Sequence, residues 1–198
     1  MGASTLHRRC AKVGRMELPP SAATPGSTPR WQWSRLPTLS PTALYAALAA
    51  RQQVFAVEQQ CAYLDADGLD HRAWHLLGWS RTEPAILVAY LRVLDPGAKY
   101  VEPSIGRVLT TLALRGRGQG RGLMREGIAG CASRYPGAAI RISAQRHLAP
   151  FYASLGFATV SPPYDEDGIP HVEMLLAAPP ASTAHPSTAC MDSPAGLR

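Results

Sequence analysis

A glycine-rich segment constrains this chain more than any other feature. Residues 115–122 read R-G-R-G-Q-G-R-G, with glycine at every second position. Alternating glycines let backbone N–H groups converge, and the apolar spacing from Leu123 to Cys131 predicts a helix directly afterwards. A helix N-terminus adds unsatisfied N–H donors and the positive end of its dipole. The segment therefore predicts a phosphate-binding turn, with a purely structural glycine turn as the alternative.

Two other glycine-rich motifs do not fit this segment. A nucleotide P-loop requires G-x-x-x-x-G-K-[ST], and no lysine follows the glycines here. A dinucleotide G-x-G-x-x-G fails because Arg121 or Leu123 stands where the third glycine is due, and residues 139–143 lack the expected acid. If the turn binds a phosphate, its ligand therefore belongs to another class; the structural glycine turn stays the alternative.

The rest of the chain predicts a mixed α/β structure. Ser40 followed by Pro41 is typical of a helix start, and Gly156 suits the residue after a helix end. Hydrophobic spacing predicts helices at 41–58, after residue 122 and at 149–155, and strands at 71–79, 86–94, 104–112, 139–143 and 171–176. Strands that alternate with helices indicate a layered α/β domain.

Composition limits the partners. Residues 31–177 carry 14 basic and 12 acidic side chains, so a general nucleic-acid surface is not expected. Four cysteines lie far apart without a C-x-x-C pair, which argues against a metal site and a disulfide framework and favours the cytoplasm. No apolar run approaches the ~20 residues of a bilayer span, so no membrane partner is expected.

The glycine turn resembles the coenzyme A pyrophosphate loop of the GNAT superfamily of N-acetyltransferases. That family's second signature is matched by F-Y-A-S-L-G-F at 151–157, one helix and one strand further on. Segments 54–70, 105–116, 143–157 and 164–175 resemble its ElaA-type subgroup. A weaker resemblance to acyl-homoserine-lactone synthases is confined to R-x-x-V-F-x-x-E at 51–58.

The resemblance implies a single-domain GNAT fold at 31–177. Its central sheet would be mixed, mostly antiparallel and splayed at the cofactor site, with helices on both faces. Residues 1–30 and 178–198 are small, polar and proline-rich, so we expect disordered tails there. A monomer and a homodimer remain equally open.

The resemblance also implies where acetyl-CoA would bind. The pantetheine arm would lie in the splay beside the backbone of the last residues of strand 104–112, and a backbone N–H there would stabilise the oxyanion. Gln145 stands where many relatives carry an asparagine that touches the coenzyme. The expected donor contacts are Leu109, Thr110, Thr111, Arg115, Gly116, Arg117, Gly118, Gln119, Gly120, Arg121, Gly122 and Gln145.

Catalytic and acceptor residues follow from the same resemblance. Tyr152 is expected to protonate the departing thiolate, the alternative being a packing tyrosine. Glu58, at the end of the first helix, is the candidate base, whereas His75 within an apolar strand is expected to be a core histidine. The acceptor pocket is expected to contain Phe55, Tyr63, Asp67 and His171.

The resemblance therefore implies direct transfer of an acetyl group from acetyl-CoA to a primary amine of a small molecule or peptide. Two alternatives remain open at this stage. A non-catalytic acyl-CoA-binding sensor would keep the glycine turn without needing Tyr152. A longer-chain acyltransferase, similar to the acyl-homoserine-lactone synthases, would need a wide acyl tunnel.

Overall fold

The computed structural model describes residues 28–61, 63–116 and 118–179. The expected tails therefore fall almost wholly outside the described residues and stay predictions. Arg30, which was assigned to the N-terminal tail, begins the first strand. Within the described residues, no helix combines the length and the apolar character needed to cross a membrane.

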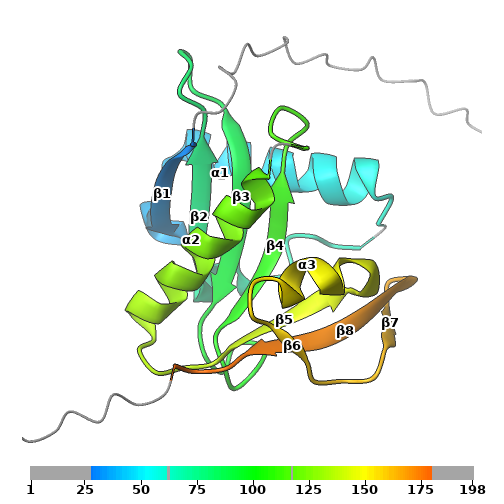
Figure 1. The fold of residues 1–198 in the computed structure, drawn as a ribbon. Helices are drawn as coiled ribbons and strands as arrows, with labels where there is room; N and C mark the ends of the chain where they lie inside the picture. Colours follow the sequence, from blue (N-terminus) through cyan, green and yellow to red (C-terminus); the bar gives the residue numbers. More distant parts are fainter. Residues whose placement is uncertain (1–27, 62, 117, 180–198) are drawn as a thin grey trace, which may run out of the picture.

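One mixed sheet organises the chain (Figure 1). Its strands are β1 (Arg30–Arg35), β2 (Ala73–Trp79), β3 (Leu87–Leu94), β4 (Ser104–Thr110), β5 (Ile140–Gln145), β6 (Ala158–Thr159), β7 (Tyr164–Glu166) and β8 (Ile169–Leu176). The spatial order is β1-β2-β3-β4-β5-β8-β6, and β7 also pairs with β8. Only β4 and β5 are parallel, so the sheet is mostly antiparallel, as expected.

The predicted first helix is two segments rather than one. Ser40 caps it as expected, with Oγ accepting from the N–H of Ala43 at 3.2 Å. The α-helix α1 (Pro41–Arg51) then gives way to a π-helix, η2 (Gln52–Glu58). Gln59 N–H bonds Val54 C=O at 3.0 Å, which is the wider i→i−5 spacing. This change of period sets where the end of the segment points.

Other element boundaries also differ slightly from the expectation. His71 lies in the 3₁₀ turn η3 (Leu69–Arg72), not in β2, and the two further short turns are η1 (Leu36–Thr38) and η4 (Arg146–Leu148). The remaining helices are α2 (Gln119–Arg134) and α3 (Ala149–Ala153). Strands β1, β6 and β7 are additions that hydrophobic spacing did not reveal.

Helices cover both faces of the sheet, as expected (Figure 1). Leu76 and Leu77 are neighbours in β2, so they point to opposite faces. Leu76 belongs to the core beneath α2 and α3, and Leu77 to the core beneath α1. Helix α2 lies close to the sheet, because a Cβ at Gly130 would sit 2.1 Å from the Trp33 ring. The sheet is thus buried between α1 on one side and α2 with α3 on the other.

Candidate active site

The glycine turn enters α2 in the geometry that suits an anion. Gly116 and Gly118 have φ of +75° and +70°, a region that disfavours side chains. Gly118 is the N-cap of α2, so no side chain caps the helix, and its first turn carries no acidic residue. The uncapped N–H donors and the positive dipole end therefore face outward without an internal anion. Arg117 lies outside the described residues.

The two described arginines of this turn have partners within the protein. Arg115 Nη2 lies 2.6 Å from Glu58 Oε2, and Arg115 Nε donates to Thr110 C=O at 3.0 Å. Arg121 Nη1 donates to Ser154 Oγ at 2.7 Å. The turn is thereby tied to β4, to the π-helix and to the residue that follows α3.

Strands β4 and β5 are paired only where they begin. Ser104 and Arg141 form their one register pair, and Arg141 N–H donates to Pro103 C=O at 3.0 Å. The strands then diverge towards the N-terminus of α2 (Figure 1). The splayed sheet expected from the sequence is confirmed, and the later part of β4 has its β5-facing edge unpaired.

A β-bulge reorients the last part of β4. Tyr90 of β3 pairs with Leu109 and Arg92 with Gly106, so Arg107 and Val108 share one position. Arg107 takes φ +52° there. Because of the extra residue, Ile105 packs in the core under α2 while Leu109 packs in the core under α1.

The end of β4 offers backbone and side-chain donors to the splay. Thr111 N–H bonds Val88 C=O of β3 at 2.9 Å. Since N–H groups alternate along a strand, that of Thr110 points to the β5 side. Thr111 Oγ1 is buried, and it has no hydrogen-bond partner among the described residues. Orphaned buried polar atoms are rare, and Arg92 Nε is another that has no partner among the described residues.

Tyr152 lies on α3, 8% exposed, in the core shared with α2. Its ring makes edge contacts with Phe151 and Phe157, at centroid distances of 5.0 and 6.1 Å. Burial raises the pKa of Tyr152 to about 12, so the phenol is protonated at neutral pH. The side chain can thus act as a hydrogen-bond or proton donor.

The end of the π-helix contacts both sides of the splay. Gln145 Nε2, at the end of β5, donates to Gln59 Oε1 at 3.2 Å. Glu58, which precedes Gln59 in the chain, forms an ion pair with Arg115. It also accepts a longer hydrogen bond, of 3.4 Å, from Gln53. The candidate base is therefore ion-paired with a residue of the glycine turn.

His171 lies beside Gln145 across the β5–β8 ladder. Its Nδ1 is 2.8 Å from the C=O of Ile169, which fixes Nδ1 as the protonated nitrogen of the neutral ring. Tyr164 of β7 stacks on the imidazole, with ring centroids 6.2 Å apart. The structure thus brings His171 next to one predicted donor contact, with Nε2 as its acceptor nitrogen.

A buried ionic network, here named the Arg–Asp network, fills the space between α1, the loop before η3 and the bulge of β4. Its members are Arg51, Arg92, Arg107, Asp65, Asp67 and Asp70. Arg51 and Arg92 are 1% and 3% exposed, and both donate to Asp70 Oδ1 at 2.9 Å. Three positive charges meet three negative ones, so the network is internally balanced.

One predicted acceptor residue belongs to the Arg–Asp network, and two others lie beside it. Burial disfavours ionised Asp67, but hydrogen bonds and charge from Arg92 outweigh it and lower the pKa of Asp67 to about 2. The Arg107 guanidinium lies 5.9 Å from the Phe55 ring and 5.1 Å from the Tyr63 ring. Phe55, Tyr63 and Asp67 are therefore assembled around Arg107, and the carboxylate of Asp67 is already engaged.

His75 is the core histidine that its apolar strand predicted. It is 2% exposed, with Nδ1 2.7 Å from the hydroxyl of Tyr90 and Nε2 3.1 Å from the C=O of Asp70. Arg51 and Arg92, by contrast, were not recognised from the sequence. The signal for Arg92 was a charged residue within an apolar run, L-V-A-Y-L-R-V-L at 87–94, and Arg51 begins the R-x-x-V-F-x-x-E stretch.

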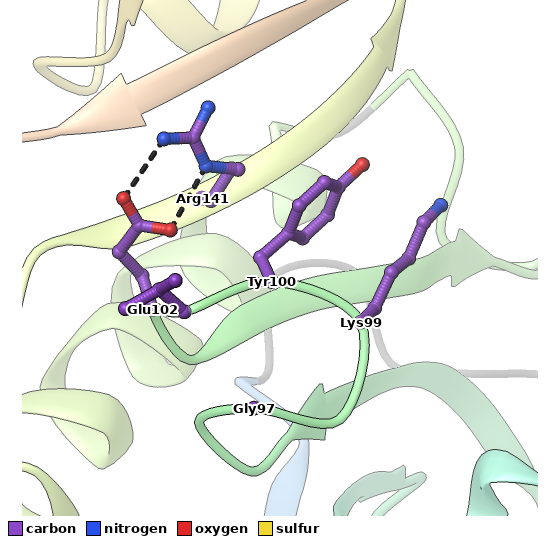
Figure 2. Close-up of a pocket in the computed structure, with 6 residues that line it drawn as sticks. Gly97, Lys99, Tyr100, Glu102 and Arg141 are labelled. Atoms are coloured by element: carbon purple, nitrogen blue, oxygen red, sulfur yellow. Dashed lines mark hydrogen bonds and ion pairs between the residues drawn. The ribbon is translucent and has the colours of Figure 1, made fainter.

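A separate hollow of about 500 Å³ lies near the beginning of β5 and contains none of the predicted site residues (Figure 2). Its lining is Gly97, Lys99, Tyr100, Val101, Glu102 and Arg141. Arg141 donates to both oxygens of Glu102, at 3.0 and 2.8 Å, and pairs with Glu173 at 2.7 Å. Its cation is thus satisfied internally.

Comparison with known proteins agrees with this architecture. The family described as "Acetyltransferase (GNAT) domain" matches residues 49–178. A UPF0039 protein from Synechocystis is 49% identical over 76% of this chain and 96% of its own length. Protein ElaA of Escherichia coli is 42% identical over 73% of this chain and 94% of its own. The crystal structure of an acyl-CoA N-acyltransferase from Pseudomonas aeruginosa, 38% identical, covers 76% of this chain and all of its own with a TM-score of 0.71.

The chain therefore belongs to the GNAT acetyltransferase family. Within it, the relatives place the chain in the ElaA-type subgroup.

Proposed function

We propose that this protein transfers an acetyl group from acetyl-CoA to a primary amine of a small molecule or peptide, by direct attack of the amine on the thioester. The observation that carries the proposal is the juxtaposition of an acid-free, uncapped α2 N-terminus with the unpaired edge of β4. One feature suits a diphosphate and the other suits an extended amide-bearing arm.

The residues present fit such a donor. The turn at 116–122 supplies backbone donors for the diphosphate, together with the charge of Arg115 and Arg121. The Thr110 N–H on the splay side suits a carbonyl of the pantetheine arm, and Thr111 Oγ1, which has no partner within the described part of the chain, is a further group that the arm could satisfy. Gln145 borders the opposite side of the splay.

Acyl transfer then needs three further groups. A backbone N–H on the β5 side of β4 stabilises the oxyanion as the amine attacks the carbonyl carbon. Tyr152, whose phenol is protonated at neutral pH and whose pKa burial raises further to about 12, donates to the sulfur as the carbon–sulfur bond breaks. The ammonium proton of the acceptor goes to a base, for which Glu58 remains the candidate from sequence.

The acceptor approaches from the side of α1. Phe55 and Tyr63 flank the partly exposed Arg107 there, and His171 borders Gln145. Because the Asp67 carboxylate is held by Arg92 and Arg107, recognition of the acceptor relies on the other members of this set.

The test is a two-stage measurement. Calorimetry with acetyl-CoA and with coenzyme A asks whether the donor binds. Thiol release with acetyl-CoA against a panel of primary amines then asks whether transfer occurs, and mass analysis of the product identifies the acyl group. Binding followed by acetylation of an amine supports the proposal. Binding without turnover on any amine supports a sensor, and turnover restricted to long-chain acyl donors supports the longer-chain acyltransferase.

A further inference from the structure

The last residue of the π-helix and the C-cap residue after it contact one predicted donor residue on each side of the splay. Glu58 Oε2 lies 2.6 Å from Arg115 Nη2, beside the glycine turn. Gln59 Oε1 accepts from Gln145 Nε2 at 3.2 Å, at the end of β5. These two neighbouring side chains connect the π-helix to both walls of the splay.

The contact to Arg115 is one that a diphosphate can replace. A guanidinium binds carboxylates and phosphates through the same planar set of N–H donors. The Arg115 and Glu58 side chains are 39% and 23% exposed, and ion pairs so open to solvent are weak. Arg115 Nε, in contrast, is anchored to the C=O of Thr110, which holds the guanidinium at the end of β4 during such an exchange.

We propose that Glu58 is a positioning residue that competes with the diphosphate of the donor for Arg115. This inference rests on the proposed function, since it requires acyl-CoA to bind at the glycine turn. Donor binding exchanges the carboxylate of Glu58 for phosphate at Arg115, and it also frees this carboxylate, which is the candidate base for the acceptor.

The experiment measures the Kd of coenzyme A by calorimetry for the wild-type chain, Glu58→Gln and Glu58→Asp. Removal of the competing anion is expected to tighten binding about two- to fivefold in Glu58→Gln, given the usual strength of exposed ion pairs. Glu58→Asp keeps the anion and is expected to return the Kd towards the wild-type value. Glu83→Gln changes net charge equally at an exposed position and is expected to leave the Kd unchanged.

A double-mutant cycle separates competition from simple charge repulsion. Arg115→Gln is expected to weaken binding, and Glu58→Gln is expected to add nothing in that background. Repulsion between Glu58 and phosphate would instead persist without Arg115. Unchanged or weaker binding by Glu58→Gln, or a gain that survives in Arg115→Gln, overturns the inference while leaving the proposed function intact. Failure of the wild-type chain to bind coenzyme A refutes the proposed function itself.

Discussion

The acceptor side and the donor side of the candidate site differ in how their charges are compensated. In the Arg–Asp network each buried arginine meets carboxylates at 2.7–2.9 Å, and the charges balance without a ligand. At the α2 N-terminus, the helix has neither a capping side chain nor an acid in its first turn, although such groups stabilise most helix starts. The contrast teaches that charges on the acceptor side are balanced within the fold, although Arg92 Nε has no hydrogen-bond partner among the described residues, whereas the donor side is open to an anion.

The largest effect is expected when a cation is removed from the Arg–Asp network. Arg92→Met removes a cation that is 3% exposed and leaves Asp67 and Asp70 each with one arginine fewer. We expect a loss of about 3–5 kcal/mol in the free energy of unfolding, chiefly because the buried carboxylate of Asp70 becomes undercompensated. Urea unfolding measures it. Arg121→Gln, on the exposed donor side, should change stability by no more than about 0.5 kcal/mol; equal losses in the two variants would contradict the contrast.

A second large effect is expected at Tyr152, the proposed proton donor to the sulfur. Tyr152→Phe removes the proton donor but keeps the aromatic contacts with Phe151 and Phe157. We expect kcat to fall by about 100-fold, the lower range for general acid catalysis, with the Kd of coenzyme A unchanged. Steady-state kinetics on an identified acceptor, with calorimetry, would show it. Full turnover with intact binding would make Tyr152 a packing residue.

The network should also respond to acid in a defined window. Since the pKa of Asp67 is lowered to about 2 in the folded chain, its ionised form stabilises the fold at any pH above its ordinary value near 4. That contribution, on the order of 1 kcal/mol for a partly exposed group, is lost as the pH falls from about 4 to about 2. Urea unfolding at several pH values tests this. The loss should be smaller in Asp67→Asn, and an identical pH profile in both chains would argue against the pairing.

The smallest effect separates the donor side from the acceptor side most clearly, because stability should rise while affinity for coenzyme A falls. Gln119→Glu places an acid in the first turn of α2, where the dipole favours it. Stability should rise by about 0.3–1 kcal/mol, while the Kd of coenzyme A should weaken about two- to fivefold. The neutral variant Gln119→Ala serves as the control for loss of the side chain. Tighter binding by the acidic variant would mean that the helix start does not receive the phosphates.

Local chemistry explains what could be predicted from the sequence. The glycine turn, the Ser40 cap and the strand containing His75 are decided by residues close together in the chain, and the structure has them as expected. The splay between β4 and β5 was predictable only through resemblance to a family.

Long-range contacts explain what was missed. Arg51 and Arg92 lie far apart in the chain, and the fold brings them to the same carboxylate of Asp70. The π-helix differs from an α-helix by one residue in hydrogen-bond spacing, and hydrophobic periodicity does not resolve that difference. Its end contacts Arg115 and Gln145, which local sequence cannot place next to it.

The central claim is that the backbone of the glycine turn holds the diphosphate of the donor. Its most direct test is an NMR titration that follows the amide signals of Gly116, Gly118, Gln119 and Gly120 with coenzyme A, and separately with pantetheine, which lacks the diphosphate. Our account predicts large shifts of these amides with coenzyme A, and shifts confined to Thr110 and Thr111 with pantetheine. Saturable binding of coenzyme A that leaves the four amides of the turn unmoved would contradict it.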